Sequence, residues 1–343
     1  LSGTNTYTGD TTINAGILRV ANGDAIVGNV ILLNAGSAAF DLNGSNETVG
    51  SLSGGGLLGG NVTLVAGTLT TGDVGSDTYA GIISGTGGGL IKQGSGTLTL
   101  TGMNTYTGAT TINAGILEVQ NGSALADAGL VSIADIAGAT LAVTDSETIG
   151  SISGGGTTGG EIALANNQVL TTGNGSTDDQ FAGIISGAGG LTKAGTDTLT
   201  LSGNNIHTGI MTISAGTLSI GTVGDGGVVS SNLGSAATAA ANLVFDGGTL
   251  KYTGPIASTN RNFTLTAGKE STIDVAPNTL TLSGASIGTN GGLIKAGAGK
   301  LVLSGNNLFT GVTTINAGIL EVQSGSALFD TGLVSIANTA GAT

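Results

Sequence analysis

LTGMNTYTGATTINAGILEV, from Leu100 to Val119, is one of four versions of a single phrase in this chain. The other versions begin at Leu1, Leu201 and Leu303 and read LSGTNTYTGDTTINAGILRV, LSGNNIHTGIMTISAGTLSI and LSGNNLFTGVTTINAGILEV. Successive versions start 99 (100 − 1), 101 (201 − 100) and 102 (303 − 201) residues apart. Because a long, nearly constant period is typical of arrays of structural units, the sequence predicts a repeat protein rather than a compact domain around one site.

The composition favours strands and turns, and it argues against several classes of partner. The 343 residues include 66 glycines, 2 prolines and no cysteine, and only 8% of them are charged. Collagen would need glycine at every third position, and the scarcity of Lys, Glu and Arg argues against long helices. A formal net charge of −13 is unsuited to nucleic acid or anionic membranes, which attract Lys and Arg. The absence of cysteine excludes disulfides and thiolate metal sites.

Short runs of alternating apolar and polar residues recur between clusters of Gly, Asn, Asp and Ser, as in 97–101, 116–119 and 130–133. This period of two indicates short strands, which can pair if the chain coils so that each turn lies on the previous one. We therefore predict an all-β fold, a parallel β-helix or β-solenoid, rather than a β-propeller, whose blades usually have longer strands and more aromatic residues. The expected inward positions are Ile13, Leu18, Val20, Ile112, Leu117, Val119, Ile213, Leu218, Ile220, Ile315, Leu320 and Val322.

The phrase divides the chain into superrepeats of about 100 residues. We expect one continuous solenoid over residues 1–343, with superrepeats 1–99, 100–200 and 201–302 and a partial one at 303–343. Residues 51–56 match 151–156, and residues 79–85 match 181–187, in support of this division. Segment 221–285 lacks the triple glycine and carries both prolines, so a loop or an altered cross-section is expected there. The chain starts inside a phrase and stops within a unit, which indicates a part of a longer protein.

Residues 96–119, with the Lys-x-Gly that precedes such phrases at 92–94 and 295–297, resemble the autotransporter-associated β-strand repeat, also called the passenger-associated transport repeat. The resemblance implies a right-handed parallel β-helix. It also implies the passenger of a Gram-negative type V secreted protein, which an outer-membrane β-barrel translocator exports and which is extracellular or displayed on the cell surface. The repeat is a scaffold in that family, so the resemblance implies no ligand and no cofactor.

Two sets of equivalent residues are candidates for structural ladders. Asparagine tolerates left-handed turns and bonds nearby backbone, and a position that accepts Tyr, His or Phe requires a flat ring, expected to stack at a turn. The asparagines are Asn5, Asn104, Asn205 and Asn307 in one row and Asn14, Asn113 and Asn316 in another; the rings are Tyr7, Tyr106, His207 and Phe309. Since His207 is the only histidine and its equivalents are Tyr and Phe, we expect no catalytic role for it.

Other chemistry finds little support in the sequence. Residues 75–79 only partly resemble a calcium-binding nonapeptide, so we expect no metal site and solvated turn acids instead. Glu47 and Glu147 occupy equivalent positions, which we interpret as surface decoration. An enzyme that processes polysaccharides would need paired carboxylates. The segment where we would look for them is 246–274, which carries Asp246, Lys251, Tyr252, Arg261, Lys269, Glu270 and Asp274.

We interpret the sequence as a structural stalk or adhesin segment of a large extracellular bacterial surface protein, and not as an enzyme. Its expected partners are a host-cell or matrix surface, a glycan, or copies of itself. Two alternatives stay open, a self-assembling extracellular filament, since exposed strand edges invite pairing, and a β-helical polysaccharide-processing enzyme.

Overall fold

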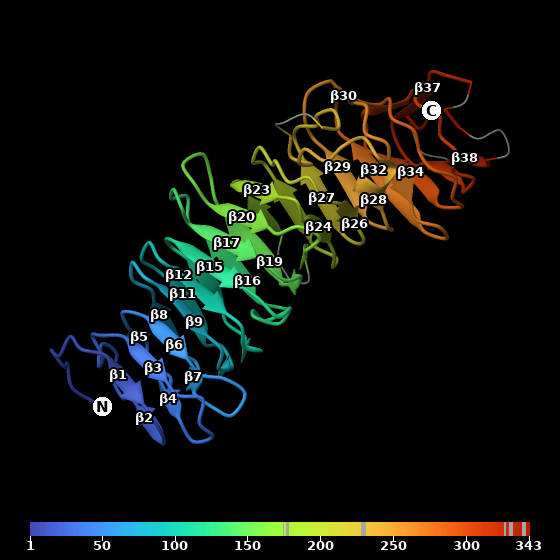
Figure 1. Ribbon diagram of the computed structural model, residues 1–343. Coiled ribbons are helices and arrows are strands. Elements are labelled where there is room, and N and C mark those ends of the chain that lie inside the picture. Colours follow the sequence, from blue (N-terminus) through green and yellow to red (C-terminus); the bar gives the residue numbers. More distant parts are fainter. Residues whose placement is uncertain (174, 176–177, 228–230, 326, 329–331, 338–340) are drawn as a thin grey trace. The chain divides into compact units, whose positions relative to one another are not determined.

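The chain forms two compact units, Leu1–Leu170 and Thr171–Thr343, and each is a parallel β-solenoid. The computed structural model describes residues 1–173, 175, 178–227, 231–325, 327–328, 332–337 and 341–343. Within each unit, the chain visits three faces in turn, so that successive coils place parallel strands side by side (Figure 1). A short 3₁₀ helix, η1 (Ala240–Asn242), is the helical element of the described residues. The prediction of an all-β parallel solenoid is therefore confirmed.

Three sheets enclose the core of the first unit. Sheet I contains β1 (Thr11–Ile13), β3 (Val30–Leu32), β6 (Leu52–Gly54), β9 (Ser76–Tyr79), β12 (Thr97–Leu100), β15 (Ile116–Val119), β17 (Thr140–Val143) and β20 (Glu161–Leu164). Sheet II contains β2 (Ile17–Arg19), β4 (Ala39–Asp41), β7 (Asn61–Thr63), β10 (Ile83–Gly85) and β13 (Thr105–Tyr106). Sheet III contains β5 (Glu47–Thr48), β8 (Thr68–Thr71), β11 (Gly89–Lys92), β14 (Thr110–Ile112), β16 (Leu130–Ile133) and β19 (Ser151–Gly154). Strand β18 (Glu147–Thr148) follows, and β21 (Val169–Thr172) contains the boundary between the units.

The second unit repeats this plan. Sheet IV contains β22 (Asp179–Phe181), β25 (Thr198–Leu201), β27 (Thr217–Ile220), β29 (Thr249–Tyr252), β32 (Glu270–Val275), β34 (Gly292–Ala296), β36 (Thr313–Ile315) and β38 (Val334–Ile336). Sheet V contains β24 (Gly190–Lys193), β26 (Met211–Ile213), β28 (Leu243–Phe245) and β31 (Thr264–Leu265). Sheet VI contains β30 (Ala257–Thr259), β33 (Thr279–Leu282), β35 (Lys300–Leu303) and β37 (Ile319–Val322), and β23 (Ile184–Gly187) precedes β24.

The strand register stacks aliphatic side chains on one another along the coil axis. In sheet I, Leu117 of β15 lies opposite Leu98 on one side and Leu141 on the other, and Val119 lies opposite Leu100 and Val143. All six are buried. Inward and outward residues alternate along these strands, and the outward ones are mostly Thr, Ser, Glu or Ala. Each strand completes its backbone hydrogen bonds with the strands of the coils before and after it.

The predicted inward positions are buried in the two middle phrases and less so in the outer ones. Leu117, Val119, Leu218 and Ile220 are at most 1% exposed, whereas Val322 in β37 is 44% exposed. The reason is geometric, because among the described residues no further strand stacks on the outer side of β37.

Equivalent phrases do not lie on the same face of a unit. In the first unit, Thr-Thr-Ile of the first phrase forms β1 in sheet I, whereas Thr-Thr-Ile of the second forms β14 in sheet III. In the second unit, the equivalent strands are β26 in sheet V and β36 in sheet IV. A residue that recurs once per phrase therefore cannot form a straight row along one face of either unit.

The divergent segment 221–285 keeps the coil. Its C-terminal part forms β28 to β33 within sheets IV, V and VI, and its N-terminal part is an irregular stretch that precedes η1. Residues 228–230 of that stretch lie outside the described part. Among the described residues, no helix is long and apolar enough to cross a membrane.

Replacing Val119 with Asp should unfold the surrounding coils. Val119 is fully buried between Leu100 and Val143, and a carboxylate there finds no counter-charge, so we expect a loss of about 3–5 kcal/mol in the free energy of unfolding. Urea unfolding of the purified chain measures this loss. The matched control is Val74→Asp, because Val74 is 86% exposed; equal losses in the two variants would contradict the inward position of Val119.

Candidate functional site

A buried lysine lies at or next to the end of a strand in three of the four repeats and forms the most regular polar centre of the fold. Lys92 of β11, Lys193 of β24 and Lys295 of β34 are at most 1% exposed. The Lys92 ammonium donates to the carbonyls of Gln93 at 2.7 Å, Gly94 at 2.9 Å and Ala114 at 3.2 Å. The Lys295 ammonium makes the equivalent bonds to Ala296, Gly297 and Ala317. We call each such arrangement a lysine nest.

Glycines make room for the nest. Gly94, which follows Lys92 in the Lys-x-Gly turn, has φ +70°, and Gly115 in the next coil has φ +64°. Only glycine adopts such φ values at low cost, and a Cβ on Gly115 would lie 2.4 Å from the Gly94 carbonyl oxygen. The two glycine turns can therefore stack closely enough for one ammonium to reach carbonyls from both coils.

The hydrogen bonds of the nest favour the charged form of the lysine, whereas burial opposes it. Burial lowers the pKa of Lys295 to about 8, and the Asp274 carboxylate acts in the opposite direction. Burial also lowers the pKa of Lys92. Three carbonyl acceptors match the three donors of an ammonium, whereas a neutral amine would turn its lone pair toward one of them. The lysine therefore acts as a fixed cation that links two coils.

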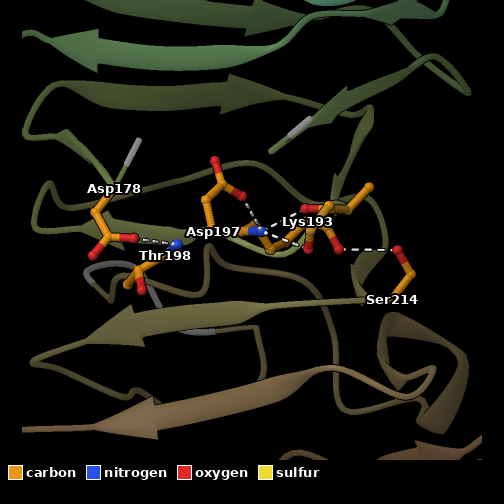
Figure 2. A network of polar contacts seen from close by, with 7 residues as sticks. Asp178, Lys193, Asp197, Thr198 and Ser214 are labelled. Carbon is orange, nitrogen blue, oxygen red and sulfur yellow. Dashed lines mark hydrogen bonds and ion pairs between the residues drawn. The ribbon is translucent and has the colours of Figure 1, made fainter. Parts of the chain in front are cut away.

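Lys193 has an additional acidic partner (Figure 2). Its ammonium lies 2.8 Å from Asp197 Oδ1, with both side chains buried, and it also donates to the Ala194 and Gly195 carbonyls. Ser214 of the next coil donates its hydroxyl to the Lys193 carbonyl at 3.0 Å. Beside this network, Asp178 accepts the backbone N–H of Thr198 at 2.8 Å. The side chains of Lys193, Ser214 and Asp178 therefore bind backbone groups or a buried counter-charge.

The first asparagine row bridges neighbouring coils. Asn104 Oδ1 accepts the Ile83 N–H at 2.8 Å from the coil before, and its Nδ2 donates to the Ala124 carbonyl at 2.6 Å in the coil after. Asn205 and Asn307 make the same pair of bonds, and Asn5 makes the forward one to Ala25. Each asparagine contacts its own neighbouring coils rather than its equivalents. The residues around 124 form no strand, so the side chain replaces ladder bonds at that face.

Glu47 and Glu147 are buried, which corrects the interpretation that they decorate the surface. They are 1% and 2% exposed. Glu147 accepts the N–H groups of Ala124 and Leu125, and Glu47 accepts those of Ala25 and Ile26. Burial outweighs these bonds, so the pKa of Glu47 is raised and that of Glu147 is raised to about 7. These carboxylates recur because each closes an irregular turn of the coil before it.

The ring row occupies a buried position in three of its four copies. Tyr106, His207 and Phe309 are at most 2% exposed, and Tyr7 is 40% exposed. Tyr106 shares a 2.6 Å hydrogen bond with Thr110. The ring pair found in the described chain is Phe245 with Phe263, edge to face at 5.9 Å, so the repeated ring is not stacked on another ring.

His207 differs from its equivalents because its two ring nitrogens have no hydrogen-bond partner within the described structure. Gly234 lies against the ring, where a Cβ would approach His207 Cε1 to 2.5 Å. Burial, assisted by the nearby Arg261, lowers the pKa of His207 to about 4. Arg261 itself is buried and donates to the carbonyls of Gly224, Gly234 and Ala236, much as the nest lysines do.

The second asparagine row lies at the surface. Asn14, Asn113 and Asn316 are exposed and directly follow β1, β14 and β36. The backbone N–H groups of Asn113 and Asn316 donate to the carbonyls of Lys92 and Lys295, which places this row beside the lysine nests.

The acidic and basic residues of 246–274 are mostly engaged with each other or with backbone. Asp246 forms an exposed ion pair with Lys269 at 2.8 Å, and Lys251 lies opposite Asp274 in the register of β29 and β32. Tyr252 donates its hydroxyl to the Pro255 carbonyl, and Glu270 is exposed at the start of β32. Among the described residues, no group of three His, Asp or Glu side chains could hold a metal ion.

The sequence analysis missed the lysine nests and the buried glutamates. A signal was present for the first, because Gly-Leu-x-Lys followed by x-Gly recurs at residues 89–94, 190–195 and 292–297. In a chain with so few charges, a lysine that recurs at an inward strand position calls for an internal acceptor set.

Comparisons with known proteins place these features in one family of repeats. Residues 1–20, 90–119, 191–220 and 293–322 match the family described as passenger-associated-transport-repeat, and the last three segments contain the nest lysines. The chain is 40% identical over 321 residues to the "Adhesin BmaC autotransporter" of Brucella suis biovar 1 (strain 1330), which covers 89% of this chain and 9% of that protein. It is 30% identical over 244 residues to the "Uncharacterized lipoprotein YdeK" of Escherichia coli (strain K12), which covers 60% of this chain and 18% of that protein. The chain thus spans less than a fifth of either relative. No solved structure matches it.

Replacing Lys92 with Met should destabilise the first unit by about 3 kcal/mol, because the carbonyls of Gln93, Gly94 and Ala114 lose a charged donor and stay buried. Urea unfolding measures the change. Lys300→Met is the control, since Lys300 pairs with Glu321 at a half-exposed site, where the loss should stay below about 1 kcal/mol. Similar small losses in both variants would disprove a stabilising role for the nest.

Replacing His207 with Phe, the residue found at the equivalent Phe309, should remove a pH dependence of stability. The folded pKa of about 4 lies below the unfolded value of 6.5, so the unfolded chain takes up a proton first as the pH falls. The stability of the native chain relative to His207→Phe should therefore fall by about 3 kcal/mol between those two pH values. Unfolding curves of both proteins across that window measure it, and parallel pH profiles would show that His207 does not titrate in this way.

Proposed function

We propose that this chain, a segment of an autotransporter passenger built on passenger-associated transport repeats, is a structural stalk segment of a surface adhesin. Such a passenger is secreted and extracellular, on the surface of a Gram-negative bacterium. The proposal goes further in assigning this segment the task of holding a binding region away from the outer membrane. The relative named as an adhesin autotransporter supports it.

One observation carries the proposal, namely that the recurrent nest lysines, the recurrent glutamates Glu47 and Glu147 and most of the first asparagine row are buried and turned toward backbone. The ammonium groups of Lys92 and Lys295 donate to backbone carbonyls, and Asn104 and Glu147 bind backbone groups of adjacent coils. Residues that select a ligand must reach it, whereas residues that hold coils together must reach backbone. The recurrent chemistry of this chain is therefore of the second kind, as a load-resistant scaffold requires.

We also propose that the segment 246–274 has no enzymatic role. Its Asp246 and Lys269 neutralise each other, and Tyr252 and Arg261 are held by backbone carbonyls. Glycoside hydrolysis needs two carboxyl groups that flank a bound sugar. The engagement of these residues with each other and with backbone favours a structural role.

The test is cryo-electron tomography of the full-length protein on its own cells, with an epitope tag inserted between Thr157 and Thr158, an exposed turn. A stalk should place one tag per particle at a constant height between the outer membrane and a distal domain. Tags repeated at regular intervals along a continuous fibre would overturn the stalk in favour of a self-assembling filament. A tag at the tip of every particle would make this segment the distal binding region instead.

A further inference from the structure

Two leucines stand at the tip of a small hairpin in the first unit. Gly56 and Gly59 exchange backbone hydrogen bonds at 2.9 and 3.2 Å, and Leu57 and Leu58 form the turn between them. The two side chains are 103% and 70% exposed. Two neighbouring leucines in open solvent have no role in the core, and exposed apolar side chains that cluster mark sites of interaction.

The hairpin holds these leucines in a fixed place. Its glycines, from Gly54 to Gly56 and at Gly59 and Gly60, all have positive φ. A Cβ on Gly59 would lie 1.9 Å from the Ala35 carbonyl oxygen, and Asn34 accepts the Leu58 N–H at 2.7 Å. A turn fixed by close backbone contacts and a neighbouring coil presents its side chains in one arrangement, which lowers the entropy cost of binding.

The turn itself does not require leucine. The equivalent hairpin one superrepeat later keeps one of these bonds, from the Gly156 N–H to the Gly159 carbonyl, with Thr157 and Thr158 at its tip. Asp135 accepts the N–H groups of Thr158 and Gly159 there, as Asn34 accepts that of Leu58. The fold is therefore compatible with polar residues at this tip, and the leucines of the first hairpin need another explanation.

Beside the leucine tip lies a hollow of about 230 Å³. Ile82 and Met103, 40% and 61% exposed, extend its apolar wall from the next two coils, and Asn61 and Asn121 supply amide groups. The residues that line it include no Asp, Glu, Lys, Arg or aromatic ring. An apolar hollow with a few polar groups is typical of binding sites.

We propose that this leucine-tip site, formed by Leu57, Leu58, Ile82 and Met103, docks an uncharged polypeptide segment of a partner that inserts one or two aliphatic side chains. The charge pattern of the lining carries the choice, because a hollow lined by no charged group offers no counter-charge to a cationic or anionic side chain and would leave it desolvated. The absence of aromatic rings in the lining removes the stacking surface that a sugar ring would use. The amides of Asn61 and Asn121 suit the backbone of an extended peptide. This inference goes beyond the proposed stalk function, because it gives the segment a docking site of its own.

The two methionines of the chain make the test direct. Met103 lines the hollow, whereas Met211 is 1% exposed in the other unit. We label the protein with ¹³C-methyl methionine and record its NMR spectrum. Titration with the blocked peptide acetyl-Thr-Leu-Ser-Leu-Thr-amide should shift the Met103 methyl resonance until the site is saturated, and the Met211 resonance should stay in place. The peptide acetyl-Thr-Asp-Ser-Asp-Thr-amide should shift neither.

The discriminating variant is Leu57→Thr with Leu58→Thr, which copies the second hairpin and so preserves the turn. We expect the affinity for the leucine peptide to fall about tenfold or more, since the variant removes the apolar area that the two leucines bury against the peptide. The control is Val74→Thr, which removes an exposed aliphatic residue outside the hollow and should leave the affinity unchanged.

Other outcomes would overturn the proposal. A Met103 shift with phosphatidylcholine vesicles but not with peptide would make the site a membrane contact, and a shift that depends on protein concentration alone would make the occupant a second copy. An equal loss of affinity for the leucine peptide in Val74→Thr would show that the peptide binds nonspecifically. Attachment of cells that display the full-length protein separates this inference from the proposed function: if the double threonine variant attaches normally, the leucine-tip site is wrong and the adhesin stands.

Discussion

The fold depends on satisfying backbone groups where the parallel ladders stop. A coil can bond its neighbours along its strands, but its turns leave carbonyl and N–H groups that point at the next coil rather than at water. Lys92 and Lys295 fill carbonyl nests, Asn104 serves one carbonyl and one N–H, and Glu147 serves two N–H groups. Each of these side chains matches the charge or dipole of the backbone groups that the turn leaves unpaired. A solenoid with 8% charged residues thus places several of its charges inside, where they connect consecutive coils.

The distribution of these devices explains why the repeat is long. A coil of three strands repeats its register with a spacing of 21 residues (Leu90 opposite Leu69), but a lysine nest recurs only once per phrase. Between nests, the coils are held together by stacked aliphatic side chains such as Leu98, Leu117 and Leu141. Because the phrase moves to another face in the next copy, the two nests of the second unit, at Lys193 in sheet V and Lys295 in sheet IV, lie on different faces of its core.

The sequence was sufficient for the strands and much of the interior, because both follow from local patterns. Alternation in Ile116–Val119 specifies which residues point inward, and the structure buries Leu117 and Val119. It was insufficient where a residue's role depends on a coil some 20 residues away. Glu147 looks like a surface acid in its local context, and only the placement of Ala124 and Leu125 above it shows a buried acceptor. The exposure of Leu57 was equally hidden, because a leucine pair suggests core residues, and only the structure places it at the tip of a hairpin.

The buried ionisable groups give the two units opposite responses to acid. Glu147 in the first unit has a folded pKa raised from 4.5 to about 7, so its contribution to stability is fully present below pH 4.5 and is lost as the pH rises through 7. His207 in the second unit has a folded pKa lowered from 6.5 to about 4, so its contribution is present above pH 6.5 and is lost as the pH falls. Desolvation causes both shifts, but it acts on an acid in one case and on a base in the other. Mild acid therefore strengthens the coils around Glu147 while it weakens those around His207, and the weakening falls in the one superrepeat whose sequence departs from the others.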